Sequence, residues 1–168
     1  MNPGGIPVMV VTMVASSLVG LGGFVPTPTR IIYNPTASAP LGFYAVEAAP
    51  AVHRGDLVVS RLPPTVAAFA DRRLYVPASV PVVKSIAAEA GDLVCRDGLA
   101  LAIDSHVVAR ARVRDSAGRP LPDWSGCRTL GAGQVLMLGG HPSSFDGRYF
   151  GPTGTDLILG RARPLWTW

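Results

Sequence analysis

Lys84 is the only lysine among the 15 Lys and Arg residues of the chain, and it lies in the apolar run 80–88. Arginine stays protonated in proteins, whereas burial lowers the pKa of a lysine because it disfavours the charged ammonium. A neutral amine near pH 7 is a general base that takes a proton from a serine hydroxyl. The alternative is a structural lysine on an edge strand that extends its ammonium into solvent.

A serine with unusual neighbours lies upstream, in the stretch 34–44. Asn34, Thr36 and Ser38 occupy alternate positions there, and Pro35 and Pro40 disfavour a helix. Alternate side chains of an extended chain share one face, so we expect these three to lie together. Ser38 is then a candidate nucleophile, and the Thr36 hydroxyl is a candidate donor to a developing oxyanion. A polar loop without catalytic function has the same composition, and this interpretation stays open.

At these residues the chain resembles the TraF-type conjugative-transfer peptidases, a branch of the type I signal peptidase family of serine proteases. The pattern Asn-x-Thr-x-Ser-x-Pro-x-Gly-x-Tyr from Asn34 is similar to the nucleophile box of that family. Lys84, followed by Gly-Asp-Leu-Val at 91–94, is similar to its base-lysine box. The stretch 144–151 is similar to its Ser-x-Asp-x-Arg-Tyr-x-Gly box. The three boxes occur in the family order, and the resemblance extends over residues 5–165.

The resemblance implies a role for each matching residue. Ser38 would be the nucleophile and Lys84 the general base, while Ser144 would orient the lysine amine. Asp146 and Arg148 would form a supporting ion pair, although an aspartate is implicated in activity in this branch and Asp146 is the matching position. A carboxylate in contact with Lys84 would raise the pKa of the lysine and make it a poorer base. We therefore expect Asp146 to bind Arg148.

The first 29 residues carry no charged side chain, and the apolar stretch 6–25 is long enough as a helix to cross the hydrocarbon core of about 30 Å. We expect a membrane anchor over residues 1–29 and a peptidase domain over residues 30–168. A cleaved secretory signal is the alternative, but it would need a basic start that is missing here. The flanking charges barely indicate an orientation. The resemblance implies a single-pass protein of the inner membrane with its catalytic domain on the periplasmic or exterior face.

Cys95 and Cys127 are the two cysteines of the chain. Two cysteines in an exported domain commonly pair, so a disulfide between them is expected on the exterior face. Two unrelated buried thiols are the alternative.

Other chemistries find less support. The three histidines show no spacing suited to a metal and no phosphate-binding loop is present, so we expect no cofactor. His141 precedes Asp146 by five residues, which leaves a Ser-His-Asp triad open, although no Gly-x-Ser-x-Gly elbow accompanies it. Arg110, Arg112 and Arg114 alternate with apolar residues and predict one solvated face of a strand. No aromatic residues interleave with them, so we expect no nucleic-acid partner.

Short apolar or alternating runs separated by turn sequences predict a mainly β protein, an antiparallel sandwich or barrel. The resemblance agrees, since it implies an antiparallel signal-peptidase-like β fold with one N-terminal transmembrane helix. Pro81 suits an edge strand or the first residues of a strand. One short helix is predicted over residues 65–74. The expected strands are residues 42–46, 57–60, 80–87, 93–96, 99–103, 106–114, 134–138 and 157–162.

These observations predict a membrane-anchored serine endopeptidase with a Ser/Lys dyad. By resemblance, its substrate is the precursor of a conjugative pilin or another exported protein, and the acyl group can pass to the substrate's own N-terminus to give a cyclic pilin. The expected partners are this precursor and the lipid bilayer. A general type I signal peptidase and an inactive anchored subunit of a secretion channel are the alternatives.

Overall fold

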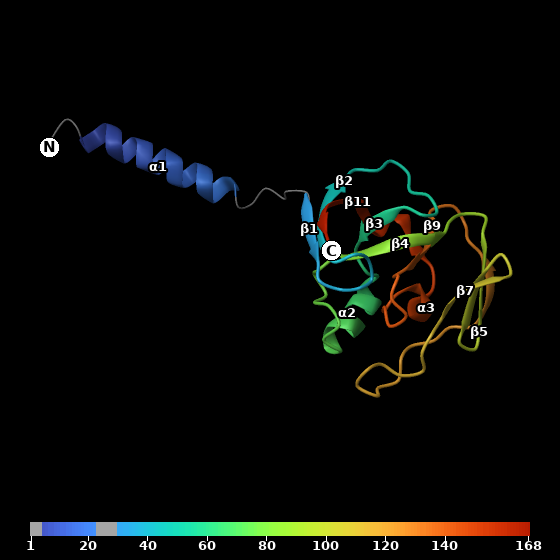
Figure 1. Ribbon diagram of the computed structural model, residues 1–168. Coiled ribbons are helices and arrows are strands. Elements are labelled where there is room, and N and C mark those ends of the chain that lie inside the picture. The colour runs from blue at the N-terminus through green and yellow to red at the C-terminus, as the bar shows by residue number, and fades with distance from the viewer. Residues whose placement is uncertain (1–4, 23–29) are drawn as a thin grey trace.

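The structure is a computed structural model that describes residues 5–22 and 30–168. Helix α1 (Gly5–Gly22) precedes a body built on two antiparallel sheets (Figure 1). The larger sheet has the spatial order β1 (Ile31–Asn34), β2 (Gly42–Glu47), β11 (Ile158–Thr167), β3 (Leu57–Ser60), β4 (Val82–Ala88), β9 (Gln134–Leu138) and β10 (Thr153–Gly154). The smaller sheet has the order β7 (His106–Arg110), β6 (Ala100–Ile103), β5 (Leu93–Asp97) and β8 (Gly126–Thr129). The helical elements of the body are α2 (Pro64–Arg72), α3 (Gly147–Phe150) and the 3₁₀-helix η1 (Thr155–Leu157).

The mainly β antiparallel prediction is confirmed. The strands expected over residues 57–60 and 134–138 have those bounds, and the predicted helix forms as α2 with Pro64 in its first turn. The strand expected over residues 106–114 is wrong in its second half, because β7 ends at Arg110. Beyond it the chain leaves the ladder, and the Arg112 amide donates to the Tyr149 hydroxyl at 3.1 Å. Strands β1, β8 and β10 were not expected. Runs of two to four residues are too short, and in β1 and β8 too exposed, to show period-2 burial.

The apolar N-terminal segment forms α1, which ends at Gly22. Over residues 5–22 and 30–168, no helix is both long and apolar enough to cross a membrane. The transmembrane helix expected over residues 6–25 is therefore not found, and the last residues of that expected span lie outside the described residues.

The strand that carries Lys84 lies inside the larger sheet. Strand β4 pairs with β3 on one side and with β9 on the other, and Lys84 lies opposite Val58. The edge-strand interpretation of Pro81 is therefore wrong, and the interpretation as the start of a strand fits. Pro81 directly precedes Val82, the first residue of β4, where its missing N–H costs no ladder hydrogen bond.

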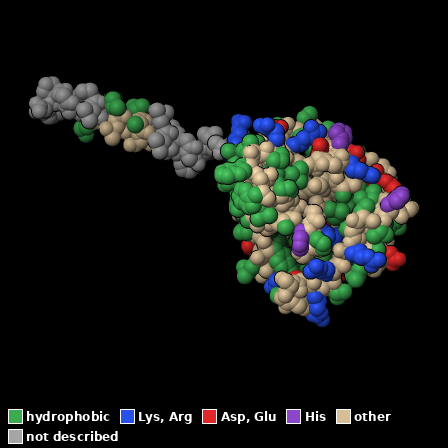
Figure 2. All heavy atoms as spheres, viewed as in Figure 1, with side chains coloured by type: hydrophobic (Ala, Val, Ile, Leu, Met, Phe, Trp, Pro, Cys, Tyr) green, Lys and Arg blue, Asp and Glu red, His purple; other side chains and the backbone are tan. Residues whose placement is uncertain are grey.

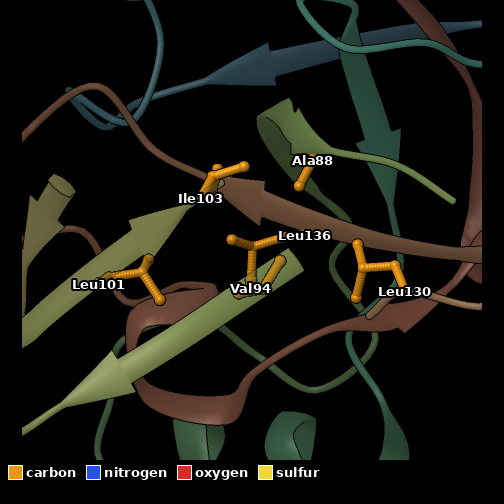
Figure 3. Packing of buried hydrophobic residues seen from close by; sticks show 6 residues of the cluster. All are labelled: Ala88, Val94, Leu101, Ile103, Leu130 and Leu136. Carbon is orange, nitrogen blue, oxygen red and sulfur yellow. The ribbon is translucent and has the colours of Figure 1, made fainter. Parts of the chain in front are cut away.

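A buried apolar cluster joins the two sheets (Figure 3). Ala88 and Leu136 of the larger sheet pack there against strands β5 and β6 of the smaller one, and each buried aliphatic side chain contributes about 1.5–3 kcal/mol. This contact fixes the smaller sheet against β4 and β9. The cluster consists of Ala88, Val94, Leu101, Ile103, Leu130 and Leu136.

Exposed apolar side chains gather on the edge of the larger sheet formed by β1, β2 and β11. Figure 2 shows hydrophobic side chains concentrated on the side of the body at which the chain enters. Aromatic rings contact one another across this edge: Tyr33 lies 5.0 Å from Phe43 and 6.3 Å from Trp168 between ring centroids. The edge formed by β1, β2 and β11 therefore has an aromatic surface, and β1 is the first strand of the body.

Candidate active site

The candidate nucleophile lies on a turn that one buried side chain organises. Asn34, the last residue of β1, donates from its amide nitrogen to the carbonyl oxygens of Thr36 at 2.8 Å, Ala39 at 3.1 Å and Pro40 at 3.2 Å. The Tyr44 hydroxyl also donates to the Pro40 carbonyl, at 2.5 Å. The extended chain expected through residues 34–38 is therefore wrong, because the Asn34 amide folds the chain into a turn around itself. Sequence reasoning did not assign Asn34 a role in the site.

Ser38 is buried, with 7% of its surface exposed, and it is held from three directions. Its Oγ donates to the Val83 carbonyl of β4 at 3.1 Å and lies 3.0 Å from the Thr36 hydroxyl. Its own carbonyl accepts from the Gly140 amide at 2.8 Å. The Thr36 hydroxyl also donates to the side-chain oxygen of Asn34 at 3.1 Å. The turn is thereby tied to β4 and to the loop that follows β9.

Lys84 is 5% exposed and lines the same cleft as Ser38. Burial lowers the pKa of Lys84 from 10.5 to about 8. Two nearby charges have smaller effects: Asp146 raises this pKa and Arg148 lowers it. Within the described part of the chain, no hydrogen bond or ion pair engages its ammonium, and none joins it to Ser38. The alternative of a solvent-directed lysine on an edge strand is therefore wrong. The side chain is a buried amine that lines the same cleft as the candidate nucleophile.

Ser144 and Ser38 both approach Gly139 at the position that a side chain would occupy. A Cβ placed on Gly139 would collide with Ser144, whose Cβ would lie 2.7 Å away, and would press tightly on Ser38 Cβ at 3.1 Å. Ser144 also lines the cleft with Lys84, but no hydrogen bond joins the two in the described residues. Sequence reasoning missed the role of Gly139, although the pair Gly139 and Gly140, shortly before the third motif, signalled a close backbone approach.

Asp146 and Arg148 form a buried ion pair behind the cleft. The Asp146 carboxylate is fully buried and accepts from the Gly139 amide at 2.7 Å and from Arg148 Nη2 at 2.6 Å. The guanidinium of Arg148 in turn donates to the carbonyl oxygens of Gly139, His141 and Pro142, at 2.9–3.2 Å. The pair therefore shapes the loop that carries Gly139 and Ser144, as the physical reading of the sequence expected.

The family model described as "Signal peptidase, peptidase S26" matches residues 6–168. The chain belongs to this signal peptidase family. Its S26 relatives include a plasmid transfer protein TraF of Escherichia coli, which is 34% identical over 172 residues covering 95% of this chain and 94% of that protein. A conjugal transfer protein TraF of Agrobacterium fabrum is 34% identical over 145 residues, covering 80% of this chain and 81% of that protein. The resemblance to the TraF-type branch is thus confirmed.

Among solved structures, a signal peptidase I from Enterococcus faecalis is similar to this S26 protein. The two are 17% identical with a TM-score of 0.40, and the match covers 68% of this chain and 98% of that chain. The family assignment therefore rests on the family model and on the transfer proteins.

The triad alternative does not fit this S26 protein. His141 Nδ1 accepts from the Ser143 amide at 3.2 Å and lies 2.6 Å from the Ser143 hydroxyl. Both Asp146 oxygens bind Arg148 and so do not orient the His141 ring. Across residues 5–22 and 30–168, no group of three His, Cys, Asp or Glu side chains is arranged to hold a metal ion.

The two cysteines of the S26 protein form a disulfide in the smaller sheet. Cys95 of β5 lies opposite Cys127 of the edge strand β8, and the bond closes a sequence separation of 32 residues. Neither residue lines the cleft. The disulfide therefore fastens the edge strand β8 of the smaller sheet to β5.

Proposed function

We propose that this signal peptidase family member is a serine endopeptidase in which Ser38 is the nucleophile and Lys84 the general base. The observation that carries the proposal is a lysine with a pKa lowered to about 8 by burial, lining one cleft of about 580 Å³ with a buried serine. A substantial fraction of such an amine is neutral near pH 7–8, where an exposed lysine would be almost fully protonated.

The reaction begins with rotation of the Ser38 side chain, since its hydroxyl rests on the Val83 carbonyl. Neutral Lys84 takes the hydroxyl proton while Oγ attacks the scissile carbonyl carbon. The amide of Ser38 donates to the oxyanion, and the hydroxyl of Thr36, 3.0 Å from Oγ, joins it by exchanging its Asn34 acceptor for the oxyanion. Collapse of the tetrahedral intermediate breaks the C–N bond, and the Lys84 ammonium returns its proton to the leaving amine. An ester on Ser38 remains.

The second half of the reaction reuses the same base. Neutral Lys84 deprotonates an incoming water or amine, which attacks the ester carbonyl and releases Ser38. Ser144 lines the cleft with Lys84, and in the proposed reaction its hydroxyl turns to the Lys84 amine and orients it, a hydrogen bond that is not formed in this structure. Asp146 and Arg148 hold the loop that carries Ser144. Water gives a linear product, whereas attack by the substrate's own N-terminus gives a cyclic one.

The substrate and place of action follow from the relatives and from the disulfide. The names of the similar proteins refer to plasmid and conjugal transfer, which supports the precursor of a pilin or another exported transfer protein as substrate. The disulfide between Cys95 and Cys127 supports a domain on the oxidising, periplasmic or exterior side of the inner membrane. The lipid bilayer as a partner stays a prediction.

The test is co-expression with a candidate pilin precursor, sought among the genes that neighbour the protein's own gene, and the product is measured by intact-mass spectrometry. Wild-type protein is expected to shorten the precursor, and a product 18 Da lighter than the linear form identifies cyclisation. Ser38→Ala and Lys84→Arg are expected to leave the precursor intact while circular dichroism shows folded protein, because arginine keeps the charge but cannot act as the base. Substantial cleavage by Lys84→Arg would contradict the mechanism, and cleavage of unrelated preproteins would favour a general signal peptidase.

A further inference from the structure

Two arginines line the cleft that holds Ser38 and Lys84. They are Arg112 and Arg114, and both are exposed to solvent. They belong to the alternating run that predicted one solvated strand face, but β7 ends at Arg110 and the two later arginines lie beyond the strand. The three arginines of this run therefore lie in two places. Arg112 and Arg114 line the cleft, and Arg110 lies outside it.

The arginine segment is fastened to the same structural unit as the candidate dyad. The Arg112 amide donates to the Tyr149 hydroxyl at 3.1 Å, and the Tyr149 ring stacks on Phe145 with 5.7 Å between ring centroids. Phe145 directly follows Ser144, and all of these residues line the cleft. The position of Arg112 relative to the reacting centre is thus set by packing and does not depend on a free loop.

Nothing in the described protein neutralises these two charges. Asp115 is the acidic side chain that lines the cleft, but its carboxylate already accepts from the Tyr75 hydroxyl at 2.6 Å and from Arg119 Nε at 2.7 Å. Over residues 5–22 and 30–168, no ion pair joins Arg112 or Arg114 to a carboxylate. The Arg114 guanidinium donates to the Gly118 carbonyl, which carries no charge to balance it.

We propose that Arg112 and Arg114 form an anionic subsite that selects precursors with an Asp or Glu side chain near the scissile bond. This inference rests on the proposed function and names the substrate feature that the same cleft recognises. A guanidinium binds a carboxylate through paired hydrogen bonds, and a cleft with low-dielectric walls strengthens the field of its charges. The occupant is a peptide carboxylate, because a chain bound at Ser38 must occupy this cleft.

Arg110 provides a matched control within the same run. It is exposed and has the same charge, but it lines a separate hollow with Ser85, Leu138 and Pro142. Arg110→Ala therefore removes the same charge from the protein while leaving the cleft lining intact.

The experiment compares peptides that span the cleavage site of the precursor and carry Glu or Gln at one position at a time. For the wild type, kcat/KM is expected to favour Glu over Gln about two- to fivefold at one or more positions, which is the range for exposed charge pairs. Arg112→Ala and Arg114→Ala should each lower this ratio towards one, Arg112→Lys should retain part of it, and Arg110→Ala should leave it unchanged. High salt should reduce the ratio, because it screens exposed charges.

Equal rates for Glu and Gln at every position, or an equal loss with Arg110→Ala, would overturn the subsite. Fluorescence anisotropy measures binding of the same peptides to Ser38→Ala protein and so tests the subsite without cleavage. If the protein binds with the expected Glu preference but never cleaves, the proposed function fails and the subsite stands. Arg112-dependent binding of phosphatidylglycerol vesicles, without any Glu preference among the peptides, would instead show a lipid-binding surface and would refute the proposal.

Discussion

The Ser38 hydroxyl donates to the carbonyl oxygen of Val83, 3.1 Å away and 45 residues later in the chain. Val83 directly precedes Lys84 in β4, so this bond ties the turn of the candidate nucleophile to the strand that carries the candidate base. The Ser38 hydroxyl proton is therefore already donated to a backbone carbonyl in the absence of substrate. In the proposed mechanism, the first event is therefore the exchange of a backbone acceptor for the lysine amine.

The pH dependence of cleavage should follow the protonation of Lys84. Burial lowers its pKa to about 8, and the protonated amine is inactive as a base, so activity should be lost as the pH falls through this value. We expect an acid limb in kcat/KM with a midpoint near pH 8, measured with a fluorogenic peptide. A rate that keeps rising up to about pH 10, where an ordinary lysine titrates, would contradict a buried base.

Lys84→Met should abolish cleavage and yet stabilise the fold below pH 8. The pKa of Lys84 is about 8 in the folded state and 10.5 in its ordinary state, so folding is penalised while both states are protonated. This pKa difference corresponds to about 3 kcal/mol, which is the largest gain in the free energy of unfolding that we expect for the variant at pH 7. The gain should shrink between pH 8 and pH 10.5, since the wild-type lysine then becomes neutral in the folded state first. Urea unfolding across this pH range measures the effect, and Ser38→Ala should retain the wild-type pH dependence.

Gly139→Ala should damage the site, because its methyl group would collide with Ser144 and approach Ser38 Cβ to 3.1 Å. We expect a loss of about 1–3 kcal/mol in the free energy of unfolding from this overpacking. A displacement of either serine should also lower kcat/KM on the order of 100-fold. Gly140→Ala is the matched control for stability, because its Cβ would meet only the Ser38 carbonyl oxygen at 3.7 Å. Equal unfolding free energies for the two variants would refute this account of the loop.

Asp146→Asn separates a structural role of this residue from proton transfer. The change leaves the Arg148 guanidinium, which is 4% exposed, without its ion-pair partner, and we expect a loss of about 3–5 kcal/mol in stability. Asp146 raises the pKa of Lys84 through its charge, so the acid limb of the folded variant should move to lower pH. Unfolding curves and a pH–rate profile provide both readouts. Unchanged stability with complete loss of activity would point to direct proton transfer.

The disulfide predicts a measurable redox effect on stability. Cys95→Ser together with Cys127→Ser opens a loop with a sequence separation of 32 and should cost about 3.5–4 kcal/mol in the chain-entropy account. Thermal unfolding of the double variant against wild type, with and without reductant, measures this. Thiol labelling of intact wild-type protein purified from the envelope should show no free cysteine before reduction. Two freely labelled thiols would argue against an exterior location.

Local patterns in the sequence predicted most of the strands and named the candidate site residues. Runs such as 57–60 and 134–138 predicted strands with the observed bounds, because burial of one or both faces of a sheet leaves its period in the residue types. The lone lysine, the serine of the first motif and the Ser-x-Asp-x-Arg pattern were each evident from residue type and spacing, and they led to the signal peptidase family that the comparisons confirm.

The tertiary structure decided how these residues meet. The turn around Asn34 replaces an extended chain because a buried amide donates to three carbonyls, which no residue period encodes. Lys84 became a buried side chain because β3 and β9 flank β4, and sheet order depends on contacts between distant segments. Arg112 lies at the cleft because β7 ends at Arg110 and the Arg112 amide donates to the hydroxyl of Tyr149, 37 residues later in the chain. The period of apolar residues in a sequence reflects the backbone conformation and the buried face of one helix or strand. The arrangement of side chains in this cleft depends instead on which helices, strands and loops pack against each other.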